Sequence, residues 1–182
     1  MGQRSRDYFF YFAYGSNLFK KRILINNPSA IFVAVGQLNN HRFDFAKYNA
    51  NWKGAVCTIV PTENEVVWGA VWKLHNDDLP ALDRQEGVAI KEYFSKIVNI
   101  IANRTNLECR TYQHFFEPPL ERNIRFTFEH LPEKRRPSVS YLNCLIKGAI
   151  ECKLPSNYIS KLKKIPHNGC FASPQIRKFL DI

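Results

Sequence analysis

Three short segments of the sequence carry residues whose types and spacing could support chemistry. The first runs from an aromatic stretch into Gly-Ser-Asn, over Tyr11 to Asn17. A strand that ends in this way and opens a helix points successive backbone N–H groups toward a ligand, where a carboxylate or a developing oxyanion can bind. The same spacing is equally typical of an ordinary strand–turn–helix with a capping serine.

The other two segments carry a carboxylate and a phenol. Asp83 and Glu86 are three residues apart and share one face of a predicted helix, and Gly87 would let a ligand or another backbone come close to Glu86. A solvated helix terminus is the commoner explanation of such a pair. Tyr141 lies on the first turns of a helix that follows Pro137, where most tyrosines belong to the core and keep a solvated hydroxyl.

Other chemistries find little support in the sequence. The five histidines lack i,i+4 partners and cysteines at ligand spacing, so we expect no metal site. There is no Gly-x-Ser-x-Gly elbow and no phosphate-binding glycine loop. The five cysteines are odd in number and never spaced as Cys-x-x-Cys, and neither a signal segment nor a long apolar run is present. These features predict a cytoplasmic chain with reduced thiols and no membrane partner.

The charge of the chain is high but scattered. The 182 residues include 26 basic and 16 acidic side chains, for a net charge of +10. The densest basic clusters, residues 20–22, 134–136 and 161–164, are short, far apart and free of interleaved aromatic residues. Single-strand binders combine positive charge with stacking aromatics, so we expect solvated surfaces here and no nucleic-acid partner.

The pattern of elements predicts one α+β domain over residues 1–182. Hydrophobic content of 45% and aromatic content of 14% exclude a disordered chain. Strands come first and helices cluster late, which favours a closed or strongly curled sheet. Residues 1–7 and 166–182 are expected to be peripheral, and residues 116–136 form an inserted polar loop. The strands are predicted over 8–14, 30–45, 55–60, 65–74, 92–102 and 107–115, with a hairpin turn at 61–64, and the helices over 18–25, 76–87, 137–149 and 155–165, with a last turn near 175–180.

Five motifs in order carry a family resemblance across residues 8–165. The chain resembles the γ-glutamylcyclotransferase family in YFAYGSN (11–17), NPSA (27–30), EVVWGAVWKL (65–74), LDRQEGV (82–88) and PSxxY (137–141). Residues 116–136 depart from the family pattern, because this connection is longer and more charged.

The resemblance implies a small mixed β-barrel flanked by helices, a homodimer, and no cofactor or metal. It also implies a cyclotransferase that converts γ-glutamyl amino acids or peptides to 5-oxoproline and the free amino acid. Glu86 then matches the general base. The remaining matches are to substrate-binding positions: Tyr11, Phe12, Ala13, Tyr14, Gly15, Ser16 and Tyr141.

Two alternatives stay open at this point. One is a related cyclotransferase that acts on glutathione or on γ-glutamylamines, relatives in which the glycine loop varies in YGSL- or YGTL-like versions. Asn17 favours the γ-glutamyl amino acid branch. The other is a non-catalytic module that binds a metabolite or nucleic acid, which the presence of Glu86 disfavours.

Overall fold

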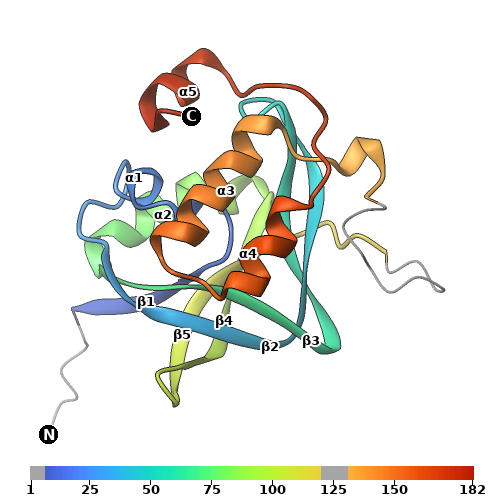
Figure 1. Ribbon diagram of the computed structural model, residues 1–182. Helices are drawn as coiled ribbons and strands as arrows, with labels where there is room; N and C mark the ends of the chain where they lie inside the picture. Colours follow the sequence, from blue (N-terminus) through green and yellow to red (C-terminus); the bar gives the residue numbers. More distant parts are fainter. Residues whose placement is uncertain (1–6, 120–130) are drawn as a thin grey trace, which may run out of the picture.

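The computed structural model describes residues 7–119 and 131–182, which form a five-stranded closed barrel with helices outside it (Figure 1). The strand order is β1-β3-β2-β4-β5, and the barrel closes by a parallel contact between β5 and β1 at Tyr11 and Arg110. All other strand pairs are antiparallel, so the sheet is mixed. The predicted fold class is confirmed.

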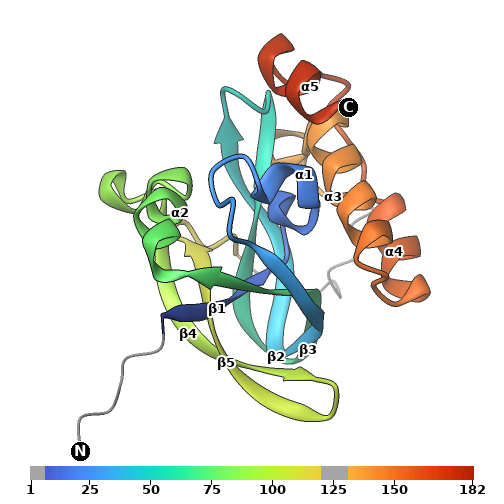
Figure 2. The same ribbon diagram turned by 90° about the vertical axis from the view of Figure 1, so that its left-hand side faces the viewer.

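The described elements follow in chain order. They are β1 (Tyr8–Ala13), η1 (Ser16–Leu18), α1 (Lys20–Ile23), β2 (Ile31–Asn49), β3 (Gly54–His75), η2 (Asn76–Asp78), α2 (Leu79–Gln85), η3 (Val88–Ile90), β4 (Tyr93–Ala102), β5 (Thr105–His114), η5 (Glu133–Arg135), α3 (Val139–Glu151), α4 (Ser156–Lys163) and α5 (Pro174–Leu180). Figure 2 shows α3 and α4 along one side of the barrel and α2 on the opposite side.

The expected hairpin turn at residues 61–64 is wrong. Residues 54–75 form one strand, β3, which pairs with β2 along nearly its whole length, and the turn of this hairpin lies at residues 50–53. The turn-like residues mark an irregularity in both strands, because Asn40 and Asn64 have positive φ angles and the register shifts beside them. The Asn64 N–H donates to Oδ1 of Asn40 at 3.2 Å, so Asn64, the last residue of the predicted turn, belongs to a bulge within a longer strand.

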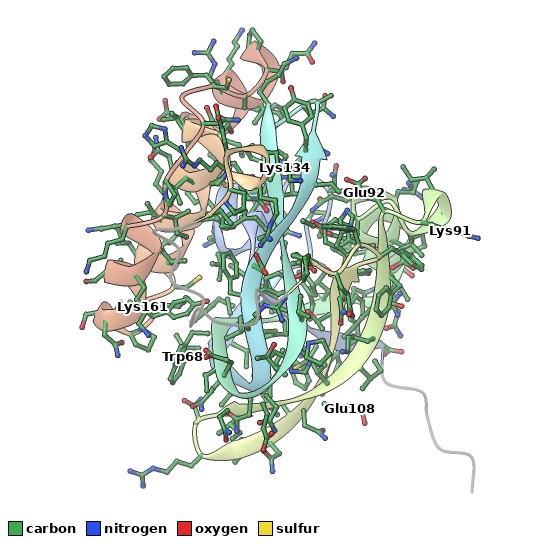
Figure 3. All side chains as sticks on the ribbon, turned by 90° about the vertical axis from the view of Figure 1, so that its right-hand side faces the viewer. Trp68, Lys91, Glu92, Glu108, Lys134 and Lys161 are labelled. Carbon is green, nitrogen blue, oxygen red and sulfur yellow. The ribbon has the colours of Figure 1, made fainter. Side chains whose placement is uncertain are left out.

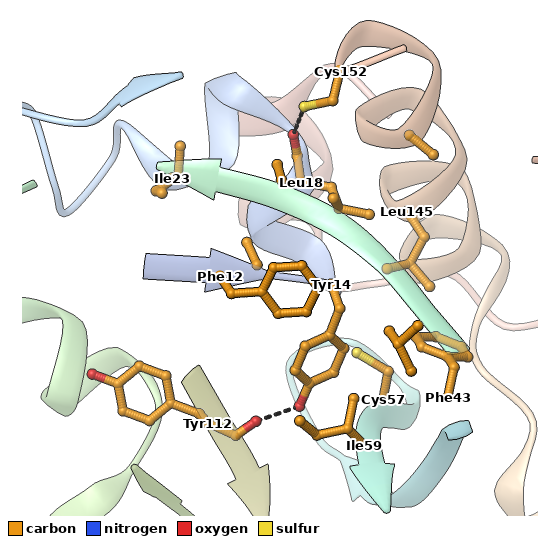
Figure 4. Packing of buried hydrophobic residues seen from close by; sticks show 14 of the residues in the cluster. Phe12, Tyr14, Leu18, Ile23, Phe43, Cys57, Ile59, Tyr112, Leu145 and Cys152 are labelled. Carbon is orange, nitrogen blue, oxygen red and sulfur yellow. Dashed lines mark hydrogen bonds between the residues drawn. The ribbon is translucent and has the colours of Figure 1, made fainter. Parts of the chain in front are cut away.

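Side chains of the barrel interior and of α3 form one continuous core. Phe12 is fully buried, and two glycines make room for its ring, since a Cβ on Gly69 would lie 2.7 Å from it and one on Gly36 would lie 3.4 Å from it. Figure 4 shows Phe12 beside Tyr14 and Leu145 of α3 across the barrel wall. The end of β1 is therefore tightly packed in the core, and this packing fixes the position of the turn that follows it.

The C-terminal tail and the described ends of the inserted loop both contact the rest of the fold. The tail beyond residue 165, expected to be peripheral, buries Ala172 and Leu180 in the core. Most of the loop expected over 116–136 lies outside the described residues. At its described ends, Arg42 donates to the carbonyl of Pro118, and Arg135 pairs with the fully buried Asp44.

Candidate active site

A cavity opens where the end of β1 meets α2, α3 and the barrel strands. Its wall includes six of the residues singled out in the sequence, which are Tyr11, Tyr14, Gly15, Ser16, Glu86 and Tyr141. Phe12 and Ala13 do not line it, because their side chains are buried in the core. The other lining residues are Asn17, Arg22, Asn49, Trp52, Val56, Cys57, Gln85, Glu92, Tyr93 and Tyr112.

Gly15 allows the turn after β1 to lie close to Cys57 of β3 and Tyr141 of α3. A Cβ at this position would be 2.5 Å from the Cys57 sulfur and 3.6 Å from the Tyr141 hydroxyl. The Leu18 N–H donates to the Gly15 carbonyl at 2.9 Å, which starts the short η1 turn. The glycine is therefore required by close approach, and it brings the backbone of the turn into the cavity wall.

Glu86 reaches the cavity because helix α2 ends at this residue. Its backbone is still helical, with φ −83° and ψ 0°, and Gly87 follows in the left-handed conformation with φ +65°. The Asn17 side-chain amide donates to Glu86 Oε1 at 3.1 Å, and that of Gln85 donates to the same atom at 3.4 Å. Asn17 thus links the turn after β1 to the carboxylate.

The electrostatic surroundings suit Glu86 to accept a proton near neutral pH. Burial raises the pKa of its carboxyl to about 7, and the nearby Glu92 carboxylate adds to the rise. The Arg22 guanidinium and the hydrogen bonds from Gln85 and Asn17 act in the opposite direction on the same pKa. A base is most effective when its pKa lies near the working pH, and this carboxyl meets that condition.

Tyr141 forms part of the cavity floor from the first turn of α3. The hydroxyl of the N-cap residue Ser138 accepts the Tyr141 N–H, and the Trp52 ring packs edge-on against the phenol at 4.9 Å. The Tyr141 hydroxyl accepts the Cys57 N–H at 3.1 Å and donates to the Cys57 sulfur at the same distance. Burial raises the pKa of Tyr141 well above its usual value, so the phenol stays neutral.

Comparison with known proteins decides the family. A model of the AIG2-like family matches residues 66–162. The bovine γ-glutamylcyclotransferase is 36% identical over 172 residues, which are 91% of this chain and 84% of that protein. The human γ-glutamylcyclotransferase is 36% identical over 165 residues, 88% of this chain and 80% of that protein. This chain belongs to the γ-glutamylcyclotransferase family.

Solved structures place the fold in the same family. A structure named γ-glutamyl cyclotransferase superposes with a TM-score of 0.82 at 32% identity, and the match covers 96% of this chain and 98% of that one. A yeast γ-glutamyl cyclotransferase specific to glutathione gives a TM-score of 0.57 at 11% identity, which shows a shared fold only.

The sequence does not predict the contacts of several residues that line the site. Asn17 was part of the motif, yet its bond to Glu86 depends on how α2 packs against the turn. Tyr93 donates to the Cys57 carbonyl at 2.7 Å, and Arg22 donates to the Gln85 side chain at 3.1 Å. These contacts join distant parts of the chain, so no local spacing signals them.

The described part of the chain gives no sign of a metal site. Within residues 7–119 and 131–182, no three histidine, cysteine or acidic side chains lie close enough together to hold a metal ion. No helix in the same ranges is long and apolar enough to cross a membrane.

Proposed function

We propose that this chain is a γ-glutamylcyclotransferase that converts γ-glutamyl amino acids or peptides to 5-oxoproline and the free amino acid, with Glu86 as general base. One observation carries the proposal: the family's signature glutamate lies in a cavity, is hydrogen-bonded by Asn17, and has a pKa near 7. A carboxylate of ordinary pKa would be a weak base at neutral pH.

The reaction is an intramolecular displacement. The α-amine of the substrate attacks its own γ-carbonyl carbon, and Glu86 accepts the proton that this nitrogen loses. The tetrahedral intermediate collapses when the bond to the leaving nitrogen breaks, and Glu86 returns the proton to that nitrogen. The products are 5-oxoproline and a neutral amine, and the carboxylate is regenerated, so no external co-reactant is needed.

The remaining work of the site is to hold the substrate in a curled conformation. Ring closure is already intramolecular, so the gain comes from keeping the amine close to the carbonyl. The Gly15–Ser16 backbone lines the cavity, and its N–H groups would hold either the α-carboxylate or the developing oxyanion. Tyr11, Tyr14 and Tyr141 are all buried, and their aromatic rings line the cavity around these charges.

The test is direct. Purified protein is incubated with γ-glutamyl-alanine, with glutathione and with a γ-glutamylamine, and 5-oxoproline is measured. We expect release from the first substrate. Release from glutathione or the amine alone would assign the chain to one of the two related activities. No 5-oxoproline from any γ-glutamyl compound would contradict the proposal and favour a binding module.

The proposal extends to the state of the protein in the cell. All five cysteines have free thiols, which supports a reducing compartment such as the cytoplasm. Thiol titration of denatured, unreduced protein should find five free groups.

The family resemblance supports a homodimer, to be checked by light scattering. The scattered basic charge supports weak or absent nucleic-acid binding, and affinity tighter than roughly micromolar at physiological salt would contradict this.

A further inference from the structure

The cavity contains a second carboxylate that the proposed mechanism does not use. Its charged lining residues are Arg22, Glu86 and Glu92. Glu86 serves as the base, and Arg22 donates to Gln85 beside it. Apart from its effect on the pKa of Glu86, Glu92 has no role in ring closure, although it faces the same space.

The position of Glu92 is fixed by the backbone on both sides. Its N–H donates to the Gly87 carbonyl at 3.1 Å, and its own carbonyl accepts the Phe115 N–H at 3.1 Å. Its carboxylate lies over Gly87, since a Cβ on that glycine would be 2.9 Å from Glu92 Oε2. The Asn49 amide donates to Glu92 Oε1 at 3.4 Å. The second carboxylate is therefore held next to the residue that follows the base.

Glu92 lies at the rim of the cavity, and the floor lies deeper. Glu92 and Asn49 are half-buried, whereas Tyr14, Cys57 and Tyr141 on the floor are buried. Lys91, the residue before Glu92, is exposed and points away from the molecule (Figure 3), so the chain reaches the surface at this point. The γ-glutamyl part of every substrate is the same, but leaving groups differ in size. Only the open side of the cavity can accommodate that variation.

We infer that Glu92 is a specificity-determining residue that selects γ-glutamyl substrates with a positively charged leaving group and disfavours those with an acidic one. This inference rests on the proposed function. A cation in the leaving group would gain an ion pair at the rim, where water screens the interaction only in part. A second acidic side chain would meet a like charge at the same place.

The inference can be separated from the effect of Glu92 on the base. Removing the Glu92 charge lowers the pKa of Glu86 and so changes the rate with every substrate. The ratio of kcat/KM for two substrates measured on one variant cancels this common change, because both substrates use the same base.

The experiment uses two pairs of substrates that are matched in the length of the carbon chain of the leaving group. In the first pair, γ-glutamyl-glutamate carries a negative charge on the leaving group that γ-glutamyl-glutamine lacks. In the second pair, γ-glutamyl-lysine carries a positive charge that γ-glutamyl-norleucine lacks. We expect the unmodified protein to prefer γ-glutamyl-glutamine in the first pair and γ-glutamyl-lysine in the second. In Glu92→Gln both preferences should fall roughly fivefold, the equivalent of about 1 kcal/mol for a partly screened ion pair. Glu108→Gln is the matched control, because it removes the same charge from an exposed site outside the cavity lining (Figure 3).

Each outcome bears on one proposal at a time. If no substrate yields 5-oxoproline, the proposed function fails. If all are turned over but Glu92→Gln keeps the ratios of the unmodified protein, only this inference is overturned. Should that variant not fold, the ratios of the unmodified protein are measured from about 0.01 M to about 1 M salt, as the Debye length falls from about 30 Å to about 3 Å. Ratios that do not move toward one would overturn the inference.

Discussion

The Asp83 carboxylate accepts a hydrogen bond from the Tyr112 hydroxyl at 2.5 Å. Arg110 completes the group, since its guanidinium donates to Asp83 at 2.7 Å and to the Tyr112 hydroxyl at 3.0 Å. Tyr112 lines the cavity, and its ring meets that of Tyr11 edge-on at 5.9 Å. Asp83, which the sequence suggested to be a solvated helix charge, instead positions one wall of the site.

We expect Asp83→Asn to weaken substrate binding and leave chemistry largely intact. The substitution removes the ionic partner of Arg110 and loosens the Tyr112 ring. KM should rise roughly 5- to 30-fold, with kcat within a few-fold of normal, corresponding to about 1–2 kcal/mol for a partly exposed charged hydrogen bond. Steady-state kinetics check this. Tyr112→Phe should give a similar loss, and the double variant should lose less than the sum. A collapse of kcat with unchanged KM would contradict a positioning role.

Glu86→Gln should abolish most turnover. The variant keeps the size of the side chain but cannot accept a proton, so kcat should fall by at least roughly 10²- to 10⁴-fold, the usual contribution of general acid–base catalysis. KM should change little, because Gly15, Ser16 and Tyr141 still line the cavity. Asp77→Asn is the control, since that side chain is 89% exposed. Near-normal turnover in the Glu86 variant would refute its assignment as the base.

The pH dependence of activity should follow the ionisation of the Glu86 carboxyl. The base must be ionised to accept a proton, and burial raises its pKa to about 7. We therefore expect kcat/KM to rise with pH and to level off above a midpoint near 7. A rate profile between pH 5 and 9 checks this. A midpoint near the ordinary pKa of glutamate, about 4.3, would mean that the ionisation of Glu86 is not what limits the reaction.

The stability of the protein should depend on pH through Glu86 in the opposite sense. Its pKa is about 7 in the folded state and near the ordinary value of about 4.3 when unfolded, so the folded state binds more protons between these values. The contribution to folding stability is full below the lower pKa and is lost as pH rises through 7. Glu86→Gln should therefore be more stable than the unmodified protein by about 1–3 kcal/mol at pH 8, and by little at pH 4. Chemical denaturation at both pH values measures the difference, and an equal difference at both would contradict it.

Gly15→Ala should destabilise the protein through a steric clash, and Cys57→Ala should relieve that clash. In Gly15→Ala the new methyl group would lie 2.5 Å from the Cys57 sulfur, which predicts a loss of about 1–3 kcal/mol of stability together with most of the activity. Cys57→Ala removes that sulfur, and the nearest remaining atom is then the Tyr141 hydroxyl at 3.6 Å. The double variant should recover part of the stability lost by the single glycine variant. Thermal denaturation compares the three proteins, and no recovery would mean that Gly15 is needed for another reason.

The parts of the site that the sequence predicted are those written in short, contiguous motifs. The aromatic strand ending at Gly15 and the helix ending at Glu86 each follow from local patterns, and so does the hairpin of β4 and β5. The strand hairpin around Pro61 was misassigned, because a bulge between two long strands uses the same residue types as a turn.

The remaining features depend on how the barrel closes. Asn17 contacts Glu86 from 69 positions away, and Tyr112 contacts Asp83 from 29 positions away. Glu92 belongs to no motif, and it joins the cavity only because β4 begins next to the end of α2. Spacing along the chain holds no information about such contacts.

The seam between β1 and β5 has a consequence for how the protein reaches its active form. Thr111 donates to the Phe12 carbonyl at 2.9 Å. Tyr14 donates to the Tyr112 carbonyl at 2.5 Å (Figure 4), so β1 and the turn after it are joined to a segment about a hundred positions later. The two hairpins can form early from nearby residues, whereas this seam must await the closure of a very long loop. A refolding chain would therefore acquire most of its strands before it acquires a site, and catalytic competence would be among the last properties to return.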